Sequence, residues 1–203
     1  MPASWLNGEI AVVGMARSGR AVATLLARTG AEVYASDSGN GKALEATAKE
    51  LREENVDVQL GAHDLDRIGR ASLVVASPGV PPGAPPLAAA RARGIEVVSE
   101  VEIGLRMLPN LHYIAITGTN GKTTTTALTA HLLSSLGLRS VAAGNIGLPL
   151  AEIALRPTPP EWVALEISSF QLHDTPSIAP RVGVLTNLSA NHLGRYATIE
   201  MIR

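Results

Sequence analysis

The chain contains no cysteine among its 203 residues, and this absence removes several kinds of chemistry. Disulfide bonds, thiolate nucleophiles and cysteine-based zinc sites are all excluded. No apolar run approaches the roughly 20 residues that span a bilayer. The first residues also lack the basic stretch followed by an apolar one that marks a secretion signal. These absences predict a cytoplasmic protein without membrane insertion.

The chain has no large excess of either charge, since its 17 Lys and Arg residues nearly balance its 18 Asp and Glu residues and give a formal net charge of −1. Such a chain carries no electrostatic footprint for nucleic acid or for an acidic membrane surface, so neither partner is expected. Hydrophobic residues make up 46% of the chain, enough for a sizeable core. The length predicts one or two domains.

The most informative stretch is Thr-Gly-Thr-Asn-Gly-Lys-Thr-Thr at residues 117–124. It follows an apolar run at 113–116 and opens a helical pattern through Leu132, which predicts a strand, a glycine-bearing turn and a helix. Glycines let several backbone N–H groups approach one anion, and the helix N-terminus adds partial positive charge. We therefore predict a nucleoside triphosphate site formed by Gly118, Thr119, Asn120, Gly121, Lys122, Thr123 and Thr124.

Within this stretch, Lys122 supplies a mobile charge for the β- and γ-phosphates, and the hydroxyl of Thr123 suits Mg²⁺. The spacing differs from the common P-loop, which has a glycine at the place of Ile116. A strand-to-helix turn with an incidental lysine is the alternative interpretation. The coincidence of a strand, two glycines, Lys-Thr and a helix favours the nucleotide site.

A second candidate turn lies near the start of the chain. A buried strand at 9–13 leads into Gly-Met-Ala-Arg-Ser-Gly, a helix extends to about Arg28, and the next strand ends at Asp37. This is a βαβ unit with a dinucleotide-like fingerprint in which Ala16 replaces the second glycine. Asp37 is placed to accept hydrogen bonds from a ribose or a base. A Rossmann-like unit without a ligand is the alternative.

Strand-like and helix-like segments alternate along the chain, which predicts an α/β fold with parallel sheets. We divide it into a Rossmann-like domain at 1–108 and a truncated P-loop-type ATP-binding domain at 109–203. A Pro/Gly-rich loop at 77–83 follows a strand, at the sheet edge where open α/β sheets bind ligands. Strands are expected at 9–13, 31–36, 56–60, 73–76, 95–98, 113–116, 140–143, 161–167 and 182–185. Helices are expected up to about residue 28, at 44–54, at 100–107, after the phosphate-binding stretch, after residue 147 and at 198–203.

The carboxyl ends of parallel strands meet at one edge of a sheet. We therefore expect Lys122, Asn145, Glu166 and His192 to share a cleft. A carboxylate beside a phosphate-binding loop is a natural ligand of Mg²⁺, which prefers oxygen. The alternatives are a structural Glu166 in a buried strand and an ordinary surface or core histidine at position 192.

Several stretches together resemble a known family. They are Gly-Thr-Asn-Gly-Lys-Thr-Thr at 118–124, Gly-Asn-Ile-Gly at 144–147, Leu-Glu-Ile-Ser-Ser-Phe-Gln-Leu at 165–172, and Asn-Leu-Ser at 187–189 followed by His192 and Arg195-Tyr196. In this order they resemble the Mur ligase family, over essentially the whole chain. The first half, with 14–19, Asp37 and Ser-Pro-Gly at 77–79, resembles the branch that adds D-glutamate.

The resemblance implies a monomeric, ATP-dependent ligase of peptidoglycan precursor synthesis. It would join D-glutamate to UDP-N-acetylmuramoyl-L-alanine through an acyl phosphate, with ATP and Mg²⁺ as cofactors. The implied catalytic residues are Lys122, Glu166 and His192. The resemblance also implies that Thr123 and Thr124 serve one Mg²⁺, while Glu166 and His192 serve a second. Asn145, Ser168 and Gln171 would face the UDP-sugar, while Arg17, Ser18, Asp37, Ser38 and Gly79 would hold its uridine and pyrophosphate end.

The chain departs from the family pattern around its histidine. The family has aspartate before the histidine and again two residues after it, whereas this chain has Asn191 and Gly194. Loss of these carboxylates would weaken support for the histidine and for the metal. The family's modified lysine and its C-terminal domain would both lie beyond Arg203. We therefore expect a fragment that is inactive alone.

Three other functions remain open. A ligase for a different amino acid, or a relative of folylpolyglutamate synthase, would share the phosphate-binding stretch. A non-catalytic module that binds a nucleotide or a UDP-sugar is favoured by Asn191 and Gly194. A dehydrogenase is disfavoured by Ala16 and by the phosphate-binding stretch downstream.

Overall fold

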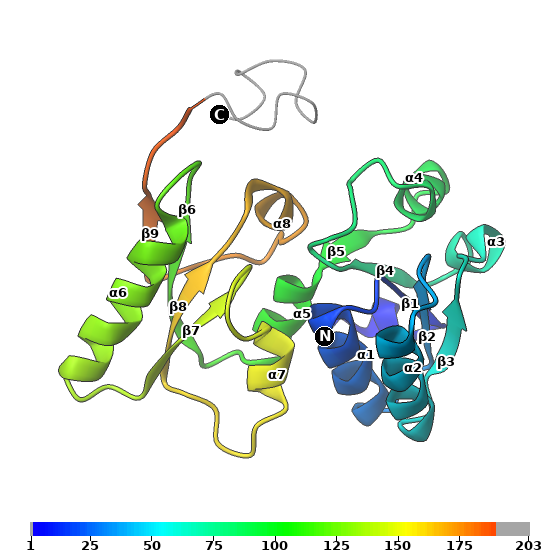
Figure 1. Cartoon of the computed structure of the whole chain (residues 1–203), viewed down its shortest axis with the longest axis horizontal. Coiled ribbons are helices and arrows are strands. Elements are labelled where there is room, and N and C mark those ends of the chain that lie inside the picture. The colour runs from blue at the N-terminus through cyan, green and yellow to red at the C-terminus, as the bar shows by residue number, and fades with distance from the viewer. Residues whose placement is uncertain (1, 190–203) are drawn as a thin grey trace.

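Two β-sheets lie side by side in the computed structural model, which describes residues 2–189 (Figure 1). Helices flank both sheets, as the alternating sequence pattern predicts. The elements of the N-terminal half are η1 (Ala3–Leu6), β1 (Ile10–Val13), α1 (Arg17–Arg28), β2 (Val33–Asp37), α2 (Lys42–Glu53), β3 (Asp57–Leu60), α3 (Leu65–Ile68), β4 (Leu73–Ala76), α4 (Pro85–Ala92) and β5 (Val97–Ser99). The later elements are α5 (Glu100–Met107), β6 (His112–Thr117), α6 (Lys122–Ser135), β7 (Ser140–Gly144), α7 (Leu150–Ala154), β8 (Trp162–Glu166), α8 (Ser169–His173) and β9 (Val182–Leu185).

The strands form two parallel sheets. The first has the order β3-β2-β1-β4-β5 and the second the order β7-β8-β6-β9. All the pairings between these strands are parallel. Parallel sheets are covered by helices on both faces, which is why β1 and β4 are continuous apolar runs without alternation. The predicted α/β class with parallel sheets is confirmed.

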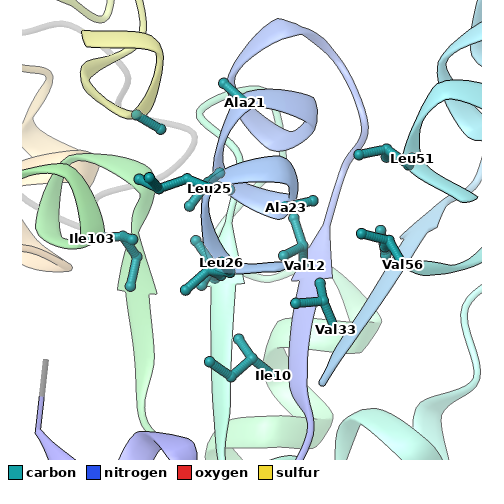
Figure 2. Packing of buried hydrophobic residues seen from close by; sticks show 14 of the residues in the cluster. Ile10, Val12, Ala21, Ala23, Leu25, Leu26, Val33, Leu51, Val56 and Ile103 are labelled. Carbon is teal, nitrogen blue, oxygen red and sulfur yellow. The ribbon is translucent and has the colours of Figure 1, made fainter. Parts of the chain in front are cut away.

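The core of the first sheet is closely packed. Ile10 and Val12 of β1 lie beneath Leu25 and Leu26 of α1, and all four side chains are buried (Figure 2). Burying an aliphatic side chain of this size stabilises the fold by about 1.5–3 kcal/mol. The sheet is therefore a rigid platform, and the loops at its carboxyl edge start from fixed points.

Helix α5 joins the two sheets, because Ile103 belongs to the core of the first sheet and Val101 and Leu105 to that of the second. Its N-cap is Ser99, as predicted, and the Ser99 hydroxyl accepts a hydrogen bond from the N–H of Glu102. The fully buried Glu100 accepts a hydrogen bond from the N–H of Ala151, at the start of α7. Burial raises the pKa of Glu100 to about 7. A buried carboxyl group thus sits at the joint between the two halves.

The strands at 73–76 and 182–185 have the predicted bounds, whereas α3, α4 and α8 are absent from the sequence prediction. Helix α4 begins with Pro85-Pro86, at positions of the first turn where a missing N–H leaves no hydrogen bond unmade. The helical turn predicted at 198–203 lies outside the described residues. No helix within residues 2–189 is long and apolar enough to cross a membrane.

Candidate functional site

The phosphate loop, residues 117–124, connects β6 to α6 and depends on two glycines. Gly118 has a φ of +133° and Gly121, the N-cap of α6, a φ of +80°. A Cβ on Gly118 would lie 2.2 Å from Oγ1 of Thr186, so only glycine fits there. No described residue accepts a hydrogen bond from the N–H groups of Lys122 and Thr123. These N–H groups at the positive end of α6 form a cradle for an anion.

The segment after β9 holds this loop in place. The carbonyl of Asn187 accepts a 2.9 Å hydrogen bond from the N–H of Thr119, and its side-chain oxygen accepts a 3.0 Å bond from the N–H of Asn120. The Asn187 amide donates back to the Asn120 carbonyl at 2.9 Å. Thr186 Oγ1 also donates to that carbonyl, at 2.7 Å. The loop conformation therefore relies on residues about 67 positions further along the chain.

The side chain of Lys122 lies across its own loop. Its Nζ donates to the carbonyls of Gly118 at 2.8 Å and Thr119 at 3.0 Å. These contacts keep the ammonium group beside the cradle. It would have to exchange a loop carbonyl for a phosphate oxygen to neutralise a nucleotide.

Glu166 lies at the carboxyl end of β8, with only 1% of its surface exposed. Its Oε2 accepts a 2.9 Å hydrogen bond from Thr123 Oγ1 of the phosphate loop, and its Oε1 accepts a 2.9 Å bond from the Asn145 amide. Asn145 is brought close by Gly144, where a Cβ would lie 2.1 Å from the Glu166 carbonyl oxygen. Thr123, Asn145 and Glu166 are thus in direct contact, and Lys122 lies in the same loop.

The donor set around Glu166 suits magnesium, because a buried carboxylate and a hydroxyl are the oxygen ligands that this hard cation prefers. Among residues 2–189, no three His, Asp or Glu side chains gather closely enough to hold a metal by themselves. Magnesium commonly completes its coordination with phosphate oxygens and water, so the residues present fit the ion. The predicted ligand His192, with Asn191 and Gly194, lies outside the described residues.

A cavity of about 740 Å³ opens at the carboxyl edge of the first sheet. This first-sheet cavity is large enough for a small-molecule ligand. Six of the residues predicted to bind substrate line it, namely Arg17, Ser18, Asp37, Ser38, Gly79 and Asn145. Because Asn145 also contacts Glu166, and Glu166 contacts Thr123, these two side chains join the cavity to the phosphate loop.

Asp37 fixes the glycine turn, residues 14–19, to the end of β2. Its Oδ2 accepts a 2.7 Å hydrogen bond from the N–H of Met15, and its Oδ1 accepts a 2.9 Å bond from the N–H of Gly39. The turn is tight, since a Cβ on Gly19 would lie 1.8 Å from the carbonyl oxygen of Gly14. Each Asp37 oxygen already has a backbone partner and keeps one lone pair for a ligand.

Arg17 points from the glycine turn to the other half of the molecule. Its Nε and Nη2 donate to the carboxylate of Glu152 at 2.8 and 2.9 Å, and its Nη1 donates to the Gly147 carbonyl at 3.0 Å. The hydrogen bond from Arg17 lowers the pKa of Glu152. Arg17 therefore lines the cavity and also joins the glycine turn to α7 and to the loop before it.

Two predicted substrate-binding residues lie apart from the first-sheet cavity. Ser168 and Gln171 form a capping box at the start of α8, in which Gln171 Oε1 accepts from the N–H and the hydroxyl of Ser168. Gln171 is 3% exposed. Neither residue lines the cavity. The geometry gives both a role in starting the helix.

Other lining residues are absent from the sequence prediction. They are His63, Leu65, Ala84, Pro85 and Pro86. His63 could have been found by the rule that picks out Asp37, because it follows the carboxyl end of a parallel strand, β3. The prolines carried no ligand-binding signal, since Pro/Gly density in sequence indicates only a turn.

Two family models match the chain in succession. The model of the "Mur ligase MurD-like, N-terminal domain" matches residues 8–99, and that of the "Mur ligase middle domain" matches residues 116–203. A Trichormus variabilis protein named UDP-N-acetylmuramoylalanine--D-glutamate ligase is 44% identical over 93% of this chain and 42% of its own length. A Geobacter metallireducens protein of the same name is 47% identical over 95% and 42%. The chain spans less than half the length of these relatives.

Solved structures share the fold. The Neisseria meningitides UDP-N-acetylmuramate:L-alanyl-gamma-D-glutamyl-meso-diaminopimelate ligase superposes with a TM-score of 0.56 at 18% identity, over 96% of this chain and 65% of that one. The Thermotoga maritima UDP-N-acetylmuramate-alanine ligase gives 0.55 at 23%, over 97% and 45%. With family models matching both halves and relatives above 40% identity along nearly all of its length, the chain belongs to the Mur ligase family.

Proposed function

We propose that the chain is the UDP-sugar-binding and ATP-binding part of a ligase that joins D-glutamate to UDP-N-acetylmuramoyl-L-alanine in peptidoglycan precursor synthesis. One observation carries the proposal. Asn145 lines the first-sheet cavity and donates to Glu166, which also accepts from Thr123 of the phosphate loop. A nucleotide-sugar in the cavity and ATP on the loop would therefore lie at opposite ends of the hydrogen-bonded chain Asn145–Glu166–Thr123. The relatives' names supply the two substrates.

The phosphate loop would bind ATP through the free N–H groups at the start of α6 and through Lys122. Thr123 and Glu166 would hold Mg²⁺, and His192 is a further expected ligand. Magnesium supplies positive charge that offsets the repulsion between the substrate carboxylate and the γ-phosphate. Lys122, released from its loop carbonyls, would add a second positive charge at the same place.

The reaction would proceed in two steps. An oxygen of the alanyl carboxylate attacks the γ-phosphorus of ATP, which forms an acyl phosphate and releases ADP. The amine of D-glutamate then attacks the acyl carbon, the C–O bond to phosphate breaks, and the nitrogen loses a proton to leave the amide. Residues 1–108 would form the UDP-sugar domain and residues 109–203 would belong to the ATP domain of a monomeric cytoplasmic enzyme.

Calorimetry with this chain tests the binding part of the proposal. We expect one site for UDP-N-acetylmuramoyl-L-alanine and a separate one for ATP·Mg²⁺. Glu166→Gln should weaken ATP·Mg²⁺ while His131→Gln, a change on the exposed face of α6, should leave both affinities unchanged. Failure of the unchanged chain to bind the UDP-sugar would contradict the proposal. In the parent protein, phosphate release should depend on D-glutamate, and the expectation that the chain alone is inactive stays a prediction.

A non-catalytic binding module is the second candidate. It is favoured by Asn191 and Gly194, and by the Lys122 ammonium group already being bound to two loop carbonyls. Such a module would bind the UDP-sugar without ATP·Mg²⁺. The same calorimetric titrations therefore separate the two functions.

A further inference from the structure

His63 lines the first-sheet cavity but takes no part in the proposed ligase chemistry. It lies in the loop between β3 and α3, and its ring is half-buried. Its Nδ1 is 2.9 Å from Oγ of Ser36, a fully buried residue of β2. The imidazole is thus anchored to the sheet through one nitrogen.

The loop that carries His63 is itself fixed. Tyr34, buried in β2, donates its hydroxyl proton to Gln59 at 2.6 Å and accepts a 3.1 Å hydrogen bond from the N–H of Asp64. Asp64 caps α3 by accepting from the N–H of Arg67 at 2.9 Å. The residue after His63 is therefore held on both sides, and the ring has a defined place on the cavity wall.

The second ring nitrogen, Nε2, has no hydrogen-bond partner among residues 2–189. Burial lowers the pKa of His63, and this effect exceeds the opposing attraction of Asp37. A neutral imidazole at neutral pH presents Nε2 as one donor or one acceptor, depending on which atom carries the proton in the bond with Ser36. His63 therefore offers the cavity a single uncharged polar atom.

The layout of the cavity decides which part of a ligand meets this atom. Asn145 marks the end nearest the phosphate loop, through its contact with Glu166. The strand β3, which precedes His63, is the edge strand of the first sheet, beyond β1 and β2 (Figure 1). A nucleotide-sugar whose carboxylate must reach the phosphate loop points its sugar toward Asn145. Its base then lies toward the β2–β3 edge.

The walls near this edge suit a flat ring. Leu65, Pro85 and Pro86 contribute apolar surface to the same cavity, while His63 and Ser38 contribute polar atoms. Pockets of this kind bind through apolar surface and fix orientation with a few placed polar groups. A pyrimidine base with keto and imide groups matches one neutral donor or acceptor better than a phosphate does.

We propose that His63 is a specificity-determining residue, whose Nε2 hydrogen-bonds the keto–imide edge of the pyrimidine in a nucleoside diphosphate sugar. This inference rests on the proposed function, because it takes the cavity to be the UDP-sugar site. Ser36 is then a positioning residue that sets the tilt of the imidazole ring. Neither residue belongs to the motifs by which the sequence indicated ligand binding.

Calorimetric titration of the 203-residue chain with UMP, CMP and UDP-N-acetylmuramoyl-L-alanine tests the proposal. His63→Phe removes the polar atom and should weaken UMP and the UDP-sugar about tenfold, the typical effect of one lost hydrogen bond. It should also shrink the preference for UMP over CMP. His63→Gln, which can place an amide near the Nε2 position, should restore most of the affinity. His131→Gln is the matched control, and ATP affinity should be unchanged in all variants.

Ser36→Ala keeps the test decisive if His63→Phe does not fold. It frees the ring without removing it and should weaken UMP by a smaller factor while thermal unfolding stays cooperative. Equal UMP affinity in a folded His63→Phe, or in Ser36→Ala where His63→Phe does not fold, would overturn the inference and leave the proposed function standing. If the unchanged chain binds no uridine nucleotide, the proposed function and this inference fall together.

Discussion

The two glycine-bearing turns of the molecule follow the same plan and use their charged residues differently. Each connects a parallel strand to the start of a helix of 12 or 14 residues. In the glycine turn, Arg17 extends away to Glu152 and Gly147, and Asp37 accepts from the N–H of Met15. In the phosphate loop, Lys122 folds back over the loop that carries it.

The difference shows that a cation next to a phosphate cradle does not by itself identify a phosphate ligand. The guanidinium of Arg17 has hydrogen bonds from three nitrogens to the opposite half of the molecule, so it joins the halves as well as bordering the cavity. Within residues 2–189, the ammonium of Lys122 donates only to carbonyls of its own loop, so it can transfer to a ligand. The hydrogen-bond partners of Arg17 and Lys122, rather than their shared positive charge, therefore distinguish a residue that joins the two halves from one that is available to a ligand.

The largest effects are expected when a methyl group is added to one of the two turns at a time. Gly19→Ala puts a Cβ 1.8 Å from the Gly14 carbonyl oxygen, and Gly118→Ala puts one 2.2 Å from Thr186 Oγ1. Each should lower the free energy of unfolding by about 3 kcal/mol. Gly19→Ala should abolish UDP-sugar binding and spare ATP, and Gly118→Ala should do the reverse, as measured by calorimetry and urea unfolding.

A neutral site provides the control for these changes. A Cβ on Gly83 would meet no atom within 4 Å, and Gly83 does not have a positive φ. Gly83→Ala should leave both affinities and the stability nearly unchanged. If Gly19→Ala alone or Gly118→Ala alone abolished binding of both ligands, the two turns would not bind their ligands independently.

Removal of each of the two cations should weaken ligand binding to a different extent. Lys122→Ala should weaken ATP·Mg²⁺ on the order of a hundredfold, because a hydrogen-bonded charge on phosphate is lost. Arg17→Ala should weaken the UDP-sugar only a few-fold, since Glu152 and Gly147 already engage its guanidinium. Calorimetry of both ligands measures these effects, with Lys49→Ala, an exposed change on α2, as the control. Equal effects of the two changes would contradict the assigned roles.

The joint between the halves should respond to pH through Glu100. Its pKa is raised from 4.5 to about 7 by burial, so the folded chain binds more protons than the unfolded chain between these values. Stability should therefore fall as the pH rises from about 4.5 through 7, by about 3 kcal/mol in total. Urea unfolding at pH 5 and pH 8 measures the slope.

Glu100→Gln should flatten this slope, because the amide has no proton to lose over the range. Glu45→Gln, an exposed change on α2, should leave the slope as it is. An unchanged slope in Glu100→Gln would assign the pH dependence to another group.

The smallest effect is expected for the ion pair that crosses the joint. The side chains of Arg17 and Glu152 are 54% and 22% exposed, so solvent screens their attraction and Glu152→Gln should cost less than about 1 kcal/mol. The pKa of Glu152 is lowered by its hydrogen bond to Arg17. This contribution is present above about pH 4.5 and disappears as the pH falls through the lowered pKa.

Urea unfolding of Glu152→Gln at pH 7 and pH 3.5, in low and high salt, measures that contribution. Glu53→Gln, an exposed change at the end of α2, is the reference. The difference between the two variants should be smaller at pH 3.5 than at pH 7, and it should shrink in high salt. A difference of the same size at both pH values would indicate a packing effect of the glutamine instead.

Strands and turns were predictable wherever a single local rule decided them. The apolar run at 73–76 and the strand–glycine–lysine–helix order at 113–132 needed only neighbouring residues, and both elements formed as expected. Helix α4 was missed because a Pro/Gly-rich stretch indicates a turn in sequence, although Pro85 sits at a favoured helix start. The signal for a turn and the signal for a helix start compete in this stretch, and packing in the folded chain decides for the helix.

Partners far along the chain were not predictable. Nothing near Arg17 points to Glu152, which lies 135 residues away, and nothing near Gln171 separates a helix cap from a sugar contact. The position of His63 after a strand end could be read from the sequence, but its contact with Ser36 forms only because β2 and β3 pair. The sequence therefore shows which residues follow strand ends and are candidates for a site. Only the long-range contacts in the structure show what each of these residues does.

The hydrogen bonds between Asn187 and Asn120 affect the order in which the two candidate binding sites can form during translation. The first sheet is complete once Ser99 has emerged, and domains tend to fold as units during synthesis. The turn around Gly118 must instead wait for translation of a segment 67 residues downstream before its shape is secured. Under the proposed function, a nascent chain would therefore complete the sugar-nucleotide cavity, whose last lining residue is Asn145, before it could secure the ATP loop.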